Sequence, residues 1–210
     1  YAKKNNLMFP QKMIYSLPLR TLTNSIYKDL TDNDQVKLHF GELITKQTGE
    51  YSDDKHFEKD IIFSTIDQTL SNFLCFPLPL SKSLANINAG AIIGSYLVFD
   101  EFHLLDSKLS MTSTLGMLRI MGNLSRFCIM TATMTDEYMK AIKDYVGNCE
   151  IVTLSDFEED TLKIQSLLPS ENKKKIHVVE GKLDAQNIVN QHKSNTIVIC
   201  NRVESAQQIY

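Results

Sequence analysis

The segment Tyr96–His103 reads YLVFDEFH and joins an apolar run to two adjacent carboxylates. Tyr96–Phe99 has the composition of a buried strand, so Asp100 and Glu101 fall at its end, where removing charge from water costs stability. Adjacent carboxylates can divide two tasks, because one can hold a divalent cation while its neighbour orients a water molecule. Such a pair can also be a solvated turn or a helix N-cap. Together with His103, it is the first candidate for chemistry.

Polar side chains also follow three other apolar runs along the chain. These segments are Ser16–Tyr27 (SLPLRTLTNSIY), Ser64–Leu70 (STIDQTL) and Met130–Thr135 (MTATMT). Each of them could be an ordinary turn from a strand into a helix, and Thr131 and Thr133 could simply cap the following helix. In an open parallel sheet, however, the carboxyl ends of the strands meet at one edge, where ligands collect. We therefore expect the four segments to share one site.

Apolar runs alternate with amphipathic stretches over most of the chain. The expected strands cover residues 12–18, 36–40, 60–66, 95–100, 126–132, 150–154, 175–180 and 196–201. The expected helices cover residues 21–30, 67–74, 104–124, 135–146, 183–192 and 203–210. Several strands are continuously apolar, which suits a parallel sheet covered on both faces. The alternation predicts an α/β fold with an open parallel sheet flanked by helices.

The composition is that of an ordinary globular protein. Of the 210 residues, 43% are hydrophobic and 22% are charged, and a formal net charge of −3 gives no overall basic field that would indicate nucleic acid. The four cysteines are scattered without metal-ligand spacing, which is typical of reduced thiols in a cytosolic protein. The most apolar run, Ala89–Phe99, is shorter than the roughly 20 residues that span a bilayer. We expect a cytoplasmic protein without a membrane segment.

An apolar strand followed by Asp-Glu-X-His is the pattern of the DExH box, the Walker B element of superfamily 2 helicases. Taken together, five segments resemble the CRISPR-associated helicase–nuclease of type I systems: SLPLRTLTNSIY, STIDQTL, LVFDEFHLLD, IMTATM and IVICNRVESAQQIY. Gln68 and Asp106 resemble that family more than they resemble the DEAH-box RNA helicases. The resemblance extends from Ser16 to Tyr210.

The resemblance implies two RecA-like lobes that clamp ATP between them, with Mg²⁺ as its metal, and pull single-stranded DNA, usually in the 3′ to 5′ direction. In that family the DNA is opened by the Cascade complex, so Cascade is an expected partner. By this resemblance Asp100 would hold the magnesium ion, Glu101 would orient the attacking water and His103 would couple nucleotide state to the DNA site. Thr131 and Thr133 would link hydrolysis to strand movement.

The resemblance also implies a DNA track along both lobes. On the first lobe it would be lined by Pro18, Arg20, Thr21, Thr65, Asp67 and Gln68. On the second lobe Asn201 and Arg202 would continue it. Contacts of this kind go mostly to phosphate and sugar, which suits a motor that must ignore sequence.

The expected domain boundary lies in the charged stretch Ser155–Lys175. We expect the first RecA-like lobe over residues 1–155, an inter-lobe linker over 156–174 and the beginning of the second RecA-like lobe over 175–210. The sequence contains no GxxxxGK[ST] phosphate loop; in the family this loop lies one helix before MIYSLPLR, so we expect it upstream of Tyr1. In that family a metal-dependent HD nuclease domain usually precedes the helicase in the same polypeptide, and the signature of this domain is absent from the sequence too. The 210 residues alone are expected to hydrolyse ATP negligibly.

Three other functions are compatible with parts of the pattern. The chain could belong to a superfamily 2 translocase of a restriction or repair system, or it could be a non-hydrolysing nucleic-acid-binding module with a RecA-like shape. A metal hydrolase that uses Asp100, Glu101 and His103 directly is disfavoured, since three ligands within four residues of a strand end cannot converge on one ion without help. An HD nuclease domain upstream would distinguish the CRISPR enzyme from a restriction or repair translocase.

Overall fold

A computed structural model gives the fold of the chain and describes residues 10–51, 53–153, 156, 184–192 and 196–210. The chain divides into two compact units, Tyr1–Thr153 and Leu154–Tyr210. The first unit contains a β-sheet and the acidic pair, while the described residues of the second unit contain two short helices.

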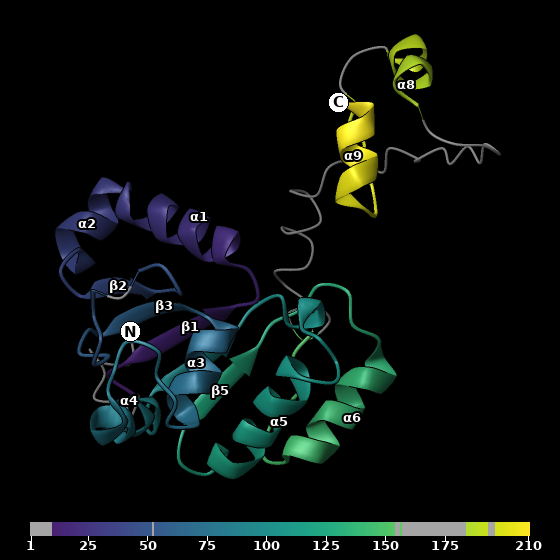
Figure 1. The fold of residues 1–210 in the computed structure, drawn as a ribbon. Coiled ribbons are helices and arrows are strands. Elements are labelled where there is room, and N and C mark those ends of the chain that lie inside the picture. The colour runs from purple at the N-terminus through teal and green to yellow at the C-terminus, as the bar shows by residue number, and fades with distance from the viewer. Residues whose placement is uncertain (1–9, 52, 154–155, 157–183, 193–195) are drawn as a thin grey trace. The chain divides into compact units, whose positions relative to one another are not determined.

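The first unit is built on a sheet of five parallel strands. The strands are β1 (Met13–Leu17), β2 (Ile44–Gln47), β3 (Ile61–Thr65), β4 (Tyr96–Phe99) and β5 (Arg126–Ile129). Their order across the sheet is β2-β3-β1-β4-β5, and every pairing is parallel (Figure 1). The predicted open parallel sheet is confirmed, and its arrangement is that of a RecA-like α/β fold.

Alternate side chains of the strands build the core on one face of the sheet. Ile14, Ile62 and Leu97 lie in one register row across β3, β1 and β4, and all three are fully buried. Burying one such side chain stabilises the fold by roughly 1.5–3 kcal/mol. Because successive side chains of a strand point to opposite faces, Tyr15 and its register partner Phe63 lie on the other face.

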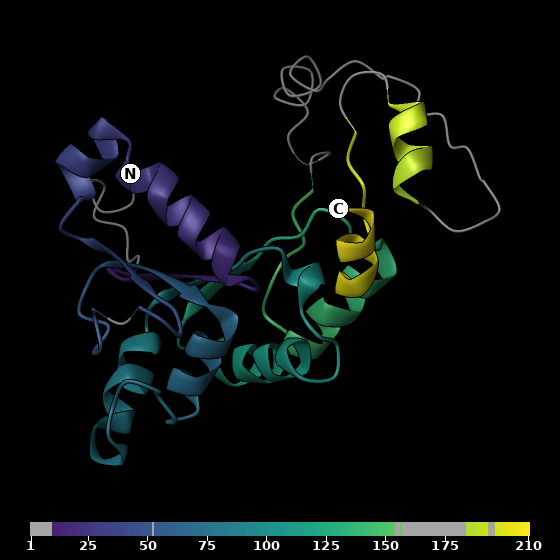
Figure 2. The same cartoon turned by 45° about the horizontal axis from the view of Figure 1, so that its top comes forward.

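Helices cover both faces of the sheet (Figure 1, Figure 2). One face carries α1 (Arg20–Thr31) and α2 (Asp34–Phe40). The other side carries α3 (Ile66–Phe73), α4 (Ala85–Ile92), α5 (Ser110–Met121) and α6 (Asp136–Val146). Two short 3-10 turns precede α4 and α5, namely η1 (Lys82–Leu84) and η2 (Phe102–Leu104). Buried side chains of α3 and α5, among them Ile66 and Leu118, pack in the same core as the strands.

The segment 36–40 belongs to α2, so the strand predicted there is wrong. Asn33 caps this helix, since its side chain accepts hydrogen bonds from the backbone N–H groups of Gln35 (3.0 Å) and Val36 (3.2 Å). Asp34 adds negative charge in the first turn, where the helix dipole favours it. The capping signal outweighs a five-residue alternation of apolar side chains, which is too short to distinguish a strand from a helix.

The sequence pattern also misses β2 and α4. β2 reads ITKQ, which is short and half polar, and α4 has neither a side-chain cap nor an acidic residue in its first turn.

Residues 150–153 form no strand, and the helix expected from residue 104 begins only at Ser110. A turn intervenes, in which the Asp106 carboxylate accepts hydrogen bonds from the N–H groups of Lys108 (3.0 Å) and Leu109 (2.9 Å).

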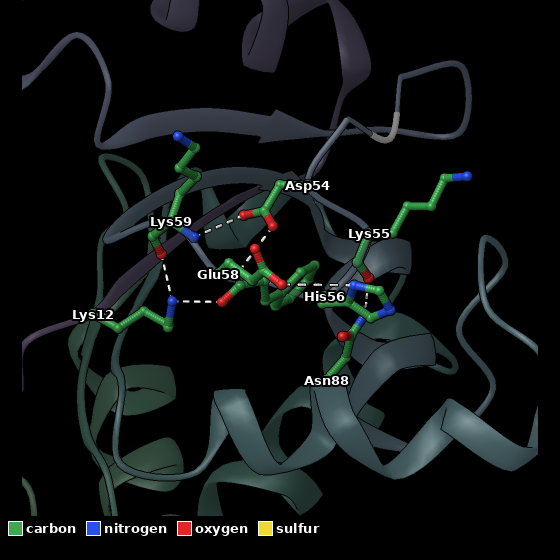
Figure 3. A network of polar contacts seen from close by, with 8 residues as sticks. Lys12, Asp54, Lys55, His56, Glu58, Lys59 and Asn88 are labelled. Carbon is green, nitrogen blue, oxygen red and sulfur yellow. Dashed lines mark hydrogen bonds and ion pairs between the residues drawn. The ribbon is translucent and has the colours of Figure 1, made fainter.

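A polar network fixes the loop between β2 and β3 (Figure 3). The Asp54 carboxylate accepts hydrogen bonds from the N–H groups of Glu58 (2.8 Å) and Lys59 (3.0 Å). The ammonium group of Lys12, next to β1, donates to the carbonyl of Lys59, and Asn88 of α4 donates to another loop carbonyl (2.8 Å). Burial lowers the pKa of Lys12, although Asp54 and other carboxylates oppose this shift. The network ties the loop to β1 and α4.

The described part of the second unit contains α8 (Ala185–Gln191) and α9 (Val203–Ile209), which confirms both helices predicted there. Asp184 caps α8, because its carboxylate accepts a hydrogen bond from the N–H of Asn187 (2.7 Å). Residues 196–200 form no strand, contrary to prediction, and the strand predicted at 175–180 lies outside the described residues. The linker and the second RecA-like lobe therefore stay predictions.

No helix in the described part of either unit combines the length and apolarity that a bilayer crossing requires.

Candidate functional site

Backbone hydrogen bonds continue past the ends of β4 and β5 and hold the following segments together. The N–H of Met130 donates to the carbonyl of Phe99 (2.8 Å), and the N–H of Phe102 donates to the carbonyl of Met130 (3.1 Å). The segment Asp100–His103, which follows β4, therefore lies against the segment that follows β5 and carries Thr131. Two of the segments with predicted chemistry meet at this edge of the sheet.

Asp100 is held by three hydrogen bonds. Its backbone N–H donates to the carbonyl of Ser16 on β1 (3.0 Å). Its Oδ1 atom accepts from the N–H of Glu101 (2.8 Å), and its Oδ2 atom accepts from the hydroxyl of Tyr15 (2.6 Å). Burial raises the pKa of the Tyr15 hydroxyl, and the hydrogen bond to Asp100 raises it further. The hydrogen bonds to Oδ1 and Oδ2 hold the Asp100 carboxylate in one orientation.

Glu101 adopts a left-handed backbone conformation, with φ 50° and ψ 41°. Few residues other than glycine adopt this conformation, and it costs about 1–3 kcal/mol. The turn sends Phe102 into the core, where it is fully buried, and leaves the Glu101 side chain 41% exposed. The chain thus places one of two neighbouring carboxylates against β1 and the other toward solvent.

His103 lies between the two strand ends. Its Nδ1 atom is 3.2 Å from the hydroxyl oxygen of Thr131 and 3.5 Å from Oε2 of Glu101, and its side chain is 24% exposed. The ring can therefore bond to Thr131 while it stays beside the Glu101 carboxylate. Thr133 differs, since it is exposed and makes no hydrogen bond to any residue of the described part of the chain. The structure brings His103 together with Thr131 but not with Thr133.

The carboxylates fit the magnesium ion that accompanies a nucleotide. Mg²⁺ prefers oxygen ligands, and in nucleotide sites one or two carboxylates share it with phosphate oxygens and water. Asp100 supplies such a carboxylate, and both of its oxygens keep a lone pair after their hydrogen bonds are made. Bound Mg²⁺ would offset the negative charge of the phosphates. Among the residues that the structure describes, no group of three or more His, Cys, Asp or Glu side chains could hold an ion by itself.

The nucleic-acid-binding residues predicted on the first unit lie in two groups. In the first group, Pro18 is half-buried after β1, while Arg20 and Thr21 are exposed in the first turn of α1. The Arg20 guanidinium pairs with the carboxylate of Glu50, which lies beyond the end of β2. Sequence reasoning missed Glu50, because a pair of residues 30 positions apart carries no local signal.

The second group lies where β3 runs into α3. Asp67 is exposed in the first turn of α3, but Thr65 and Gln68 are only 8% and 4% exposed. Ser16 and Thr69 nearby are buried as well, and their hydroxyl oxygens lie 2.7 Å apart. Contact between DNA and Thr65 or Gln68 would require this buried polar layer to open. Their role in binding stays a prediction.

Two further predicted residues, Asn201 and Arg202, lie in the second unit. Both are exposed, and Arg202 is the N-cap residue of α9. Their contacts with DNA stay a prediction.

Sequence reasoning also missed Tyr15. Within MIYSL the tyrosine looks like one more residue of an apolar strand. Its contact with Asp100 depends on β1 lying beside β4, although β2 and β3 separate these strands in the chain. No pattern in the sequence indicates that neighbour relationship.

The part of the chain that contains this site matches a model of a known protein family. The family model described as DEAD/DEAH box helicase matches residues 4–142, which is 139 of the 210 residues. The matched region contains the whole five-stranded sheet, the segment Asp100–His103 and Thr131. No curated protein matches the chain. DEAD/DEAH box helicases are ATP-dependent enzymes that act on nucleic acid, and the chain belongs to this family.

Proposed function

We propose that the chain is part of an ATP-dependent superfamily 2 DNA helicase that unwinds DNA and pulls single strands for degradation in type I CRISPR defence. The observation that carries the proposal is the arrangement at the ends of β4 and β5, where the Asp100–Glu101 pair lies beside His103 and Thr131. Family membership supports the helicase activity. The segments that resemble the CRISPR-associated helicase–nuclease support the more specific role.

The different surroundings of the two carboxylates support a division of labour between them. Asp100 is fixed by three hydrogen bonds, which suits a metal ligand whose orientation must not vary. Glu101 extends toward solvent, which suits a residue that orients a water molecule. His103 touches Thr131 on the neighbouring strand end, so it can transmit a change at the nucleotide to β5. Thr133, two residues further on, would move with the same segment.

The proposal includes two RecA-like lobes that clamp ATP and Mg²⁺ between them. Residues 1–155 would form the first lobe, 156–174 the linker and 175–210 the beginning of the second lobe. The division of the chain into two compact units after Thr153 supports this assignment. A cytoplasmic location is also proposed, with support from the free thiols of Cys75, Cys128, Cys149 and Cys200.

Single-stranded DNA is the proposed nucleic-acid partner. Arg20 offers an exposed guanidinium beyond the end of β1, at the edge of the sheet where Asp100 lies. Arg202 offers a second one, on the second unit. Phosphate contacts by such residues weaken with salt, with a log–log slope of about −0.7 for each contact on a single strand.

The test of helicase function is ATP hydrolysis and duplex unwinding by the full-length protein, with and without single-stranded DNA. We expect DNA to stimulate hydrolysis, and we expect Glu101→Gln to lower kcat by about 10²–10⁴-fold while ATP binding persists. The matched control is Glu137→Gln, in the exposed first turn of α6, which should behave like the wild type. Unwinding at the wild-type rate by Glu101→Gln would overturn the proposal.

The CRISPR role needs a separate experiment with Cascade bound to its target DNA. We expect DNA that Cascade has opened to be unwound and degraded faster than the same duplex alone. Equal rates on the two substrates would contradict a CRISPR role and would favour a superfamily 2 translocase of a restriction or repair system.

A further inference from the structure

Tyr15 connects β1 to the acid that follows β4. Its hydroxyl donates to Oδ2 of Asp100 over 2.6 Å, although the two residues are 85 positions apart in the chain. The contact is possible because β1 and β4 are neighbours, with Tyr15 opposite Val98 in the register. Val98 and Asp100 lie two residues apart on one strand path, so their side chains share a face of the sheet. A hydroxyl bound to an ionised carboxylate makes a short, strong hydrogen bond.

The ring of Tyr15 is itself held in place. It packs on Phe63 of β3, with ring centroids 5.4 Å apart and an angle of 41° between the rings. Phe63 is buried and packs in turn on Tyr27 of α1 in an edge-on arrangement, with centroids 6.4 Å apart. The hydroxyl of Tyr15 therefore projects from a supported ring and not from a mobile side chain.

The Asp100 carboxylate is oriented by this hydroxyl and by the backbone. Oδ2 accepts from Tyr15 and Oδ1 accepts from the N–H of Glu101, so the carboxylate cannot rotate without breaking a bond. Each carboxylate oxygen can accept two hydrogen bonds, which leaves lone pairs for a further ligand. Groups that hold a metal-binding side chain in this way commonly change metal affinity when they are removed.

We propose that Tyr15 is a positioning residue that orients the Asp100 carboxylate toward the divalent cation of the nucleotide. The inference rests on the proposed function, because it takes Asp100 as the residue that binds this cation. Packing alone would be served by phenylalanine, which keeps the ring contact with Phe63. The hydroxyl adds a contact to Asp100 that the core does not need.

The experiment compares Tyr15→Phe with Tyr138→Phe in the full-length protein. Tyr138 is the matched control, because its hydroxyl also has a partner in the first unit, the sulfur of Met111 at 3.0 Å. Binding of Mn²⁺ with a non-hydrolysable ATP analogue is measured by electron paramagnetic resonance, and the Mg²⁺ dependence of ATP hydrolysis is measured beside it. We expect Tyr15→Phe to weaken Mn²⁺ binding about tenfold, with kcat recovering at high Mg²⁺, while Tyr138→Phe is unchanged.

Wild-type Mn²⁺ affinity in a folded Tyr15→Phe variant would overturn the proposal, whatever its thermal stability. Tyr15→Met serves as a second hydroxyl-free variant if Tyr15→Phe does not fold, and the same result is expected of it. Asp100→Asn separates this inference from the function on which it rests. If Asp100→Asn loses Mn²⁺ binding and Tyr15→Phe does not, only the positioning role of Tyr15 is rejected. If Asp100→Asn binds Mn²⁺ like the wild type, the proposed metal-binding role of Asp100 is itself rejected.

Discussion

The Nδ1 atom of His103 lies 3.2 Å from Oγ1 of Thr131, and this contact joins the ends of β4 and β5 through their side chains. The backbone bond from the N–H of Phe102 to the carbonyl of Met130 runs alongside it (3.1 Å). Two connections, one between side chains and one between backbone groups, therefore link the two strand ends.

Breaking the side-chain connection should uncouple ATP hydrolysis from DNA. We expect His103→Ala and Thr131→Val each to lower DNA-stimulated hydrolysis about tenfold, and the double variant to be no slower than the slower single variant, because contacting partners are not additive. Thr112→Val, at an exposed position on α5, is the matched control and should stay within about twofold of the wild type. Losses that simply add in the double variant would show that the contact transmits nothing.

The left-handed backbone of Glu101 predicts an unusual response to glycine. Because φ is 50°, Glu101→Gly should give a protein more stable than Glu101→Ala by about 1 kcal/mol, measured by urea unfolding. At Glu137, inside α6, the order should reverse, since glycine in a helix costs about 1 kcal/mol relative to alanine. If the alanine variant is the more stable one at Glu101 as well as at Glu137, the turn at Glu101 is not strained.

Phe102 should carry much of the stability of the segment beside the acidic pair. It is 0% exposed, so Phe102→Ala is expected to lower the free energy of unfolding by roughly 3–5 kcal/mol. Phe76 is 73% exposed, and Phe76→Ala should change the free energy of unfolding by no more than about 0.5 kcal/mol. Similar decreases in the free energy of unfolding for Phe102→Ala and Phe76→Ala, measured by chemical unfolding, would contradict the burial of Phe102.

Tyrosine ionisation should weaken the fold at alkaline pH. The hydrogen bond to Asp53, aided by burial, raises the pKa of Tyr51 to about 12, whereas a tyrosine in the unfolded chain has a pKa of about 10. The unfolded state therefore loses its proton first, so the stability that Tyr51 contributes is complete below about pH 10 and is lost as pH rises toward 12.

Urea unfolding at several pH values, with Tyr51→Phe as the comparison, isolates this contribution from the other groups that titrate there. We expect the free energy of unfolding of the variant to fall less steeply than that of the wild type above about pH 10. The difference should begin there because the pKa of tyrosine in the unfolded chain is about 10. Identical pH profiles for the two proteins would show that the hydrogen bond to Asp53 does not persist in solution.

The pair between Arg20 and Glu50 predicts opposite effects of its two members on DNA binding. Arg20→Ala should weaken binding of single-stranded DNA and reduce the log–log salt slope by about 0.7, the value of one phosphate contact. Glu50→Gln should strengthen binding, because it frees the guanidinium for phosphate. Lys28→Ala, also exposed on α1, is the control and should change the slope less. Equal slopes for Arg20→Ala and the wild type would remove Arg20 from the DNA track.

The sequence by itself determined the strongly patterned elements and the place of the acidic pair. β1, β3, β4 and β5 are apolar runs that lose most of their contact with water only inside a sheet, so their positions follow from local composition. The place of Asp100 follows from the same reasoning, because it is the first polar residue after Tyr96–Phe99. The weakly patterned elements, α2 and β2, could not be predicted this way, since seven and four residues give too little periodicity.

Only the tertiary structure decided which side chains meet. β4 lies beside β1 and not beside β3, its predecessor in the chain, and this order brings Tyr15 to Asp100. The same packing buries Thr65 and Gln68, which the sequence presents as polar residues at a turn. The physical reason is that local preferences act over a few residues, whereas strand order is set by the free energy of packing the whole sheet against its helices.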